Sequence, residues 1–286
     1  MLRQWLQAAS HGDVAALRHI LQADYAWLEY EHFGYTALHL SVWAGRANAC
    51  AYLLAHGASV HRRINKPRDS AVHGMTPLHL ATYEGHADVV AVLLDAGAAL
   101  DALYDGCTCL QVAAKRGYFD IVELLVQRGA AMNLQDATGR TSLYDVAAWG
   151  YAKLAKLCVD HGANVNIFNS LGLGALYAAA HTGDRSTTEF LINAGANFHN
   201  LQLLTPSAAG SSLHELVGRL DQRPLHVAAL SVLMLNGPSA ESVRLLIEFG
   251  LAPTAQLEFL TALGDWATSH DQMALAKFCA DWGVCM

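Results

Sequence analysis

The sequence predicts an all-α protein built as a solenoid of stacked helix-turn-helix units. Two observations carry this prediction: a ten-residue pattern recurs along the chain, and each clear copy is followed by an amphipathic segment that ends on Gly-Ala. Thr108, Thr141 and Gly174 begin successive copies at a spacing of 33 residues. Because no unit of this length can bury its own apolar face, each must be stabilised by its neighbours.

The first half of each unit predicts a short helix. The pattern is clearest in "TPLHLATYEG" from Thr76, and it recurs in "TALHLSVWAG", "TCLQVAAKRG" and "TSLYDVAAWG". The leading threonine supplies a hydroxyl N-cap, and Pro77 stands at the first helical position, where its missing N–H costs nothing. "GALYAAAHTG" follows the pattern more loosely, and "RPLHVAALSV" keeps only its first half.

The second half of each unit predicts another helix. Segments such as "VVAVLLDAGAAL" and "IVELLVQRGAAM" place apolar residues at i, i+3 and i+4 before a glycine. That spacing is typical of an amphipathic helix, and the glycine can adopt the left-handed conformation that closes its last turn. Each unit is therefore a helix, a turn, a second helix and a polar connector.

These residues resemble the ankyrin repeat. The T-P-L-H-x-A motif and the G-x-T-P-L-H…G-H…V-V…L-L…G-A skeleton of residues 74–98 carry the resemblance, which extends well over residues 34–198. It implies antiparallel helix pairs stacked into a curved solenoid of about seven to eight repeats, degenerate caps included. It also implies β-hairpin-like loops that project from one edge.

We expect a single ankyrin-repeat domain over residues 1–286. Its expected parts are an N-terminal capping repeat at 1–33, regular repeats at 34–199 with an insertion at 61–73, a second insertion at 200–222, and degenerate repeats at 223–286. The first insertion is polar and contains Arg62, Arg63, Lys66 and Arg68. It is either a solvated loop that folding does not need or a grip for an acidic peptide or a phosphate.

Charge and composition exclude several classes of protein. The net charge is −7, with 18 Lys and Arg against 25 Asp and Glu, which argues against nucleic acid as a partner. The longest apolar run, 227–235, is far shorter than the roughly 20 residues of a membrane helix. The beginning of the sequence lacks the apolar stretch of a secretory signal. The six cysteines are too few for a disulfide framework, so we expect a cytoplasmic protein with reduced thiols and no membrane insertion.

The histidines and cysteines favour structural roles. His39, His79 and His226 occupy one slot of the repeat, where Gln111, Tyr144 and Tyr177 replace them. The resemblance implies that this slot hydrogen-bonds the backbone of a neighbouring loop. Cys107 and Cys109 lack the two further ligands of a zinc site, and packing cysteines are favoured. We expect no metal and no cofactor.

One anomaly leaves an enzyme open as the alternative. Asp145 and Asp265 stand where the repeat usually has an apolar residue, and a buried carboxylate is costly unless it is paired. A pocket on the solenoid around Asp145 and Tyr144 would make an enzyme. Alternatively, each acid faces solvent or pairs with a neighbour. Because the nucleophile and nucleotide-binding motifs are missing, we do not expect catalysis.

The resemblance implies that the chain binds another protein through its concave face. In the family, side chains at two sets of positions point into the groove of the concave face. One set is the two positions before the mid-unit glycine, and the other is the loop positions around the preceding glycine. The corresponding candidates here are Phe33, Tyr35, Trp43, Tyr83, Glu84, Tyr104, Lys115, Arg116, Arg140, Trp149 and His181. Large aromatic and arginine side chains are typical anchors of protein interfaces. We expect a monomer in the absence of the partner, and a bacterial effector delivered into a host cell, an immunity protein or an adaptor as its biological form.

Overall fold

The computed structural model describes residues 1–65 and 71–196, together with residues 268, 273, 276, 277 and 280. The chain divides into two compact units, Met1–Ala137 and Thr138–Met286. The expected second insertion at 200–222 and the degenerate repeats at 223–286 lie outside the described ranges, so a single domain over the whole chain stays a prediction. Asp265, His226, Cys279 and Cys285 lie outside them as well.

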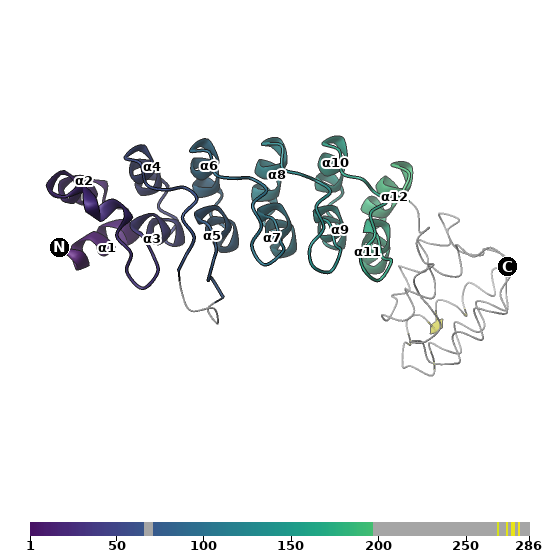
Figure 1. Ribbon diagram of the computed structural model, residues 1–286. Coiled ribbons are helices and arrows are strands. Elements are labelled where there is room, and N and C mark those ends of the chain that lie inside the picture. Colours follow the sequence, from purple (N-terminus) through teal and green to yellow (C-terminus); the bar gives the residue numbers. More distant parts are fainter. Residues whose placement is uncertain (66–70, 197–267, 269–272, 274–275, 278–279, 281–286) are drawn as a thin grey trace. The chain divides into compact units, whose positions relative to one another are not determined.

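The first unit consists of helix pairs joined by tight turns (Figure 1). Its elements are α1 (Leu2–His11), α2 (Val14–Ala23), a 3-10 helix η1 (Tyr25–Glu29), α3 (Ala37–Trp43), α4 (Ala47–Ala55), α5 (Pro77–Glu84), α6 (Ala87–Asp95), α7 (Cys109–Arg116) and α8 (Phe119–Gln127). The first helices of successive pairs pack on one another in the order α1, α3, α5, α7, and the second helices do so in the order α2, α4, α6, α8. We call these the first-helix row and the second-helix row.

The described part of the second unit repeats this arrangement. It contains α9 (Ser142–Ala148), α10 (Ala152–Asp160), α11 (Ala175–Thr182) and α12 (Arg185–Asn193). Here α9 packs on α11, and α10 packs on α12. The predicted all-α architecture of stacked helix pairs is confirmed.

The helix ends confirm the expected local chemistry. Thr36, Thr76, Thr108 and Thr141 each accept a hydrogen bond from the backbone N–H three residues on, at the start of α3, α5, α7 and α9. Gly85 ends α5 in the left-handed conformation, with φ 82°, and a Cβ there would stand 3.0 Å from the ring of Tyr118. Only glycine meets both conditions without strain.

The apolar core lies between the two rows of helices. Leu53, Leu93 and Leu125 occupy equivalent places in α4, α6 and α8, and none of them is exposed to solvent. Each belongs to the second helix of its pair, whose apolar face the sequence pattern predicts. Burial of these faces between neighbouring pairs stabilises the array, as expected for units that cannot fold alone.

Two short loops project from the first unit in hairpin form. Each closes on an isolated antiparallel bridge, His32 with Tyr35 in one and Tyr104 with Cys107 in the other. We call them the 32–35 finger and the 104–107 finger. They confirm the β-hairpin-like loops that the resemblance implies.

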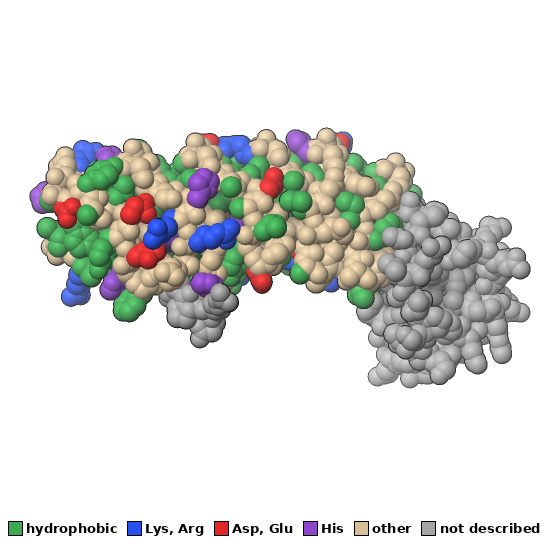
Figure 2. Space-filling view, in the orientation of Figure 1, with side chains coloured by type: hydrophobic (Ala, Val, Ile, Leu, Met, Phe, Trp, Pro, Cys, Tyr) green, Lys and Arg blue, Asp and Glu red, His purple; other side chains and the backbone are tan. Residues whose placement is uncertain are grey.

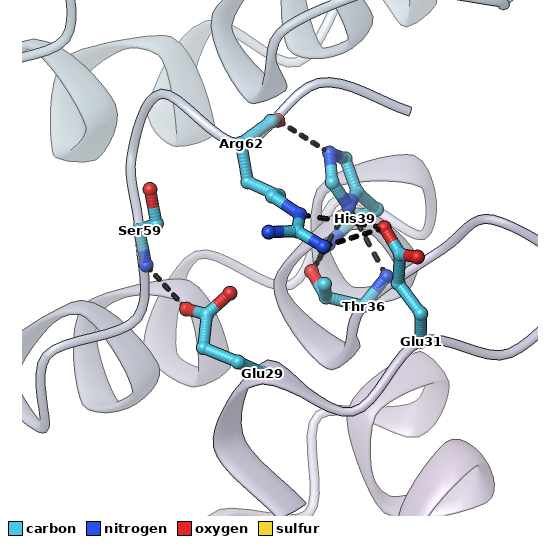
Figure 3. Close-up of polar contacts among 6 residues, drawn as sticks. All are labelled: Glu29, Glu31, Thr36, His39, Ser59 and Arg62. Atoms are coloured by element: carbon cyan, nitrogen blue, oxygen red, sulfur yellow. Dashed lines mark hydrogen bonds and ion pairs between the residues drawn. The ribbon is translucent and has the colours of Figure 1, made fainter. Parts of the chain in front are cut away.

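Buried side chains in the repeated slot tie each first helix to the connector that follows. The Nε2 of His39 donates to the carbonyl of Arg62 at 2.9 Å (Figure 3), the Nε2 of His79 donates to that of Ala102 at 3.0 Å, and the Nε2 of Gln111 donates to that of Leu134 at 2.8 Å. Each acceptor lies 23 residues after its donor. The structural role expected for this slot is confirmed for these three residues.

The same 23-residue spacing shows that the first insertion begins later in the chain than residue 61. Residues up to Arg62 keep the register of the regular repeats, and Ile64 exchanges backbone hydrogen bonds with Gly74 and Met75. Ile64 is buried, with 1% exposure, so the segment 61–73 is not simply a polar loop. Residues 61–64 belong to the ordinary connector of the repeat. In the sequence, the charged residues around Ile64 made this segment look wholly polar.

Candidate protein-binding surface

The candidate residues of the first unit lie at the C-terminal ends of the first-helix row and on the fingers. Trp43 is the last residue of α3, Glu84 the last of α5 and Arg116 the last of α7. This common position follows from the repeat register, because the mid-unit turn follows each of these helices. Hydrophobic side chains gather over the N-terminal end of this unit on the face that Figure 2 shows.

A groove lies between α1, the 32–35 finger and α3. It has a volume of about 660 Å³, and its lining includes Leu2, Leu6, Phe33, Tyr35 and Trp43. Trp43 is 51% exposed, and its ring stacks on that of Tyr35, with 5.8 Å between ring centroids. Tyr35 itself is largely buried, so its main contribution to the groove is to support Trp43.

Four other candidates line a second, smaller hollow. It has a volume of about 190 Å³ and is lined in part by Tyr83, Tyr104, Lys115 and Arg116. The guanidinium of Arg116 lies 3.5 Å from the centre of the Tyr83 ring, which is close enough for a cation–π interaction. This contact places the guanidinium against the face of the Tyr83 ring at the surface.

Lys115 is engaged within its own unit. Its ammonium lies 2.5 Å from a carboxylate oxygen of the buried Asp136 and also donates to the Cys107 sulfur at 3.4 Å. Burial disfavours its charge, but the hydrogen bonds to Asp136 and Cys107 outweigh burial and raise the pKa of Lys115. Lys115 therefore stays a fixed cation at neutral pH.

The second unit presents three further candidates. Trp149 follows α9 and is 52% exposed. His181, in α11, stacks on Tyr177, with 5.6 Å between ring centroids. The guanidinium of Arg140 lies 4.9 Å from the centre of the Tyr144 ring.

The residues of the alternative enzyme site are buried. Asp145 is 6% exposed and Tyr144 is 8% exposed, so Asp145 does not face solvent. Burial raises the pKa of Tyr144, which keeps its phenol protonated at neutral pH. Neither side chain is presented to a substrate in this arrangement.

Arg62 and Arg63, two of the four basic residues read either as part of a solvated loop or as a grip, hold the connector together. The guanidinium of Arg62 lies 3.0 Å from Glu31 (Figure 3), and that of Arg63 donates to the carbonyl of Gly74 at 2.7 Å. Two of the four cations therefore have structural partners. Lys66 and Arg68 lie outside the described residues.

Sequence reasoning missed two participants in these surfaces. Arg3 lines the first groove, and Asp136 holds Lys115. The expected capping repeat at 1–33 contributed only Phe33 to the candidates, so Arg3 was not among them. Nothing in the sequence pattern indicated Asp136, because its contact crosses from one repeat to the next.

Two other kinds of feature are absent from the described residues. Within the described residues, no group of three or more His, Cys, Asp and Glu side chains is arranged to hold a metal ion. In the same part of the chain, no helix combines the length and the apolar composition needed to cross a membrane.

Comparisons with known proteins agree with this architecture. The family model "Ankyrin repeat" matches residues 33–65, and the model "Ankyrin repeats (3 copies)" matches residues 62–136 and 110–202. The chain is similar to the crystal structure of the ankyrin repeat domain of Bcl-3, described as a unique member of the IkappaB protein family. The TM-score is 0.59 at 28% sequence identity, over 70% of this chain and 92% of that one. No curated protein matches the sequence.

Together the family matches span residues 33–202, more than half of the chain's 286 residues. The chain therefore belongs to the ankyrin repeat family, whose repeats are protein–protein interaction modules.

Proposed function

We propose that this protein binds a partner protein through the concave face formed by its first helices and fingers. The observation that carries the proposal is that large side chains on this face are both exposed and held in place. Trp43 rests on Tyr35, and Arg116 rests on Tyr83. A side chain already fixed in the free protein loses less conformational entropy when a partner binds, so such residues make efficient anchors.

The biological form that we favour is a cytoplasmic binding protein, either a bacterial effector or an immunity or adaptor protein. Its thiols support a reducing compartment, because Cys50, Cys109 and Cys158 are free and buried. Burial raises the pKa of each to about 12, so these thiols are unreactive packing groups. We propose that the protein is a monomer until it meets its partner and that it does not bind nucleic acid.

Catalysis remains without a supporting observation. The ankyrin fold is typically a non-enzymatic scaffold, and the burial of Asp145 and Tyr144 gives a substrate no direct access to either. The binding proposal needs no rearrangement of the described residues.

The test is affinity capture of the partner from native lysate, followed by binding measurements with purified protein. We expect at least two of the variants Trp43→Ala, Tyr83→Ala, Arg116→Ala and Trp149→Ala to weaken binding tenfold or more, each with an unchanged melting temperature. Truncation of an interface anchor commonly costs about 2 kcal/mol or more. Tyr52→Ala, in α4 of the second-helix row, is the matched control and should bind normally. Normal binding by all four variants, together with loss of binding in Tyr52→Ala, would show that the partner uses the other face.

A further inference from the structure

Phe33 occupies a position that is poorly suited to phenylalanine. It lies at the tip of the 32–35 finger with φ 49°, in the left-handed region, and the residue is 80% exposed. The equivalent residue of the 104–107 finger is Asp105, with φ 50°. Aspartate tolerates this conformation because its short side chain can hydrogen-bond locally, whereas a bulky side chain there is a conformational outlier. Neither folding nor solubility benefits from an exposed aromatic ring on a strained backbone.

The surroundings of Phe33 make it part of a binding surface, because it forms one wall of the groove described above. Leu2 and Leu6, one turn apart on α1, provide a second wall, and Trp43 with Tyr35 provides the third. The centroid of the His32 ring lies 4.4 Å from that of the Phe33 ring, so the two rings are in contact. A volume of about 660 Å³ falls within the usual range of ligand-binding sites, and it is large enough for two or three side chains of a peptide.

The charge of the groove is opposite in sign to that of the protein. Arg3 is the only Lys, Arg, Asp or Glu among the residues that line it, whereas the net charge of the chain is −7. Within the described residues Arg3 makes no ion pair. The acid that follows η1, Glu31, is already engaged by Arg62. The groove therefore combines aromatic walls with one cation that no neighbouring carboxylate neutralises.

We propose that this groove binds an extended peptide segment of the partner, in which a large apolar side chain lies beside an aspartate or glutamate. The apolar side chain packs between Phe33 and Trp43, and the carboxylate pairs with Arg3. Guanidinium–carboxylate pairs are directional, so Arg3 selects the acidic residue and sets the direction of the peptide. This inference rests on the proposed binding function and adds the chemistry of the ligand.

The experiment selects a phage-displayed library of random dodecapeptides on the full-length protein. We expect the enriched peptides to share a large apolar residue next to Asp or Glu. Synthetic copies, measured by fluorescence anisotropy, should lose at least tenfold in affinity when that acid is replaced by its amide. Selection on Arg3→Glu should enrich Lys or Arg at the same place, while the charge reversal Arg18→Glu on α2 serves as control and should leave the preference for acids unchanged.

Phe33→Gly separates binding from folding. Glycine adopts the left-handed conformation freely, so the variant should keep or raise the melting temperature. Its affinity for the selected peptides should fall at least tenfold. Asp105→Gly, at the same place in the other finger, reports what this backbone change does to stability when no aromatic ring is lost.

Several results would overturn the inference. These are a library without enrichment, enrichment of neutral or basic peptides, an unchanged preference in Arg3→Glu, or full affinity in Phe33→Gly. If any of them occurred while capture of the partner still depended on Tyr83 and Arg116, the proposed function would survive and only the assignment of this groove would fail.

Discussion

Replacement of His79 by glutamine should remove part of the acid sensitivity of the fold. The Nε2 of His79 faces the carbonyl of Ala102 and must carry a hydrogen, so its Nδ1 accepts from the hydroxyl of Thr76, 2.7 Å away. The ring is 1% exposed, and burial lowers the pKa of His79 to about 4. Protonation would add a second N–H where an acceptor is needed, within an environment that disfavours charge.

The sign and size of the effect follow from proton linkage. Between about pH 6.5 and pH 4 the unfolded chain holds a proton on His79 and the native protein does not, so the free energy of unfolding falls as the pH falls through this range. The stability linked to this group is complete above pH 6.5, and about 3 kcal/mol of it is lost by pH 4. His39, whose pKa burial also lowers to about 4, adds a similar loss.

Glutamine is the matched replacement because the chain uses it in the next repeat. Gln111 accepts from the backbone N–H of Thr108 at 2.8 Å and donates to the carbonyl of Leu134 at 2.8 Å. His79→Gln should therefore cost less than about 1 kcal/mol at pH 8, whereas His79→Leu, which loses both hydrogen bonds, should cost about 2–4 kcal/mol.

The assay is urea unfolding followed by circular dichroism at pH 8, 6, 5 and 4. The difference in unfolding free energy between wild type and His79→Gln should change by about 3 kcal/mol as the pH falls from 8 to 4, so that the variant becomes the more stable protein at pH 4. Other titrating groups are common to both proteins and cancel in this difference. Parallel pH profiles for the two proteins would refute the assignment of His79 as a buried neutral ring.

Three further stability changes follow from burial and charge. Leu93→Ala, at a site with no exposure, should lower the free energy of unfolding by about 2–5 kcal/mol. It should also make the adjacent repeats unfold less cooperatively, which calorimetry would detect. Ile64→Ala should cost about 2–4 kcal/mol of unfolding free energy, measured by urea unfolding. The control His61→Ala, at an exposed residue, should cost less than about 0.5 kcal/mol. Equal effects would show that the connector does not bury Ile64. Lys115→Met should cost about 1–3 kcal/mol because the Asp136 side chain is 3% exposed, whereas Arg128→Met, paired with the 69% exposed Asp95, should cost less than about 1 kcal/mol. A larger loss for Arg128→Met would contradict this ranking.

The sequence by itself determined the repeat architecture, because each helix end depends on local chemistry. A threonine that caps its own helix and a glycine that closes the helix need no distant partner, so Thr76 and Gly85 mark α5 in the sequence alone. The structural role of His39 and His79 was also predictable, since a slot that repeats in register indicates a contact that repeats with it.

Only the tertiary structure decided which of these side chains act together at the surface. Tyr35 and Trp43 both line the groove, but only the structure shows that Tyr35 is buried and that the exposed Trp43 stacks on it. Arg62 looked like a free cation until folding placed it 3.0 Å from Glu31, which lies 31 positions earlier in the chain. This ion pair joins residues of different repeats, and periodicity within one repeat carries no information about it. For the same reason the groove around Phe33 and Arg3 emerged only once α1, the 32–35 finger and α3 had packed together.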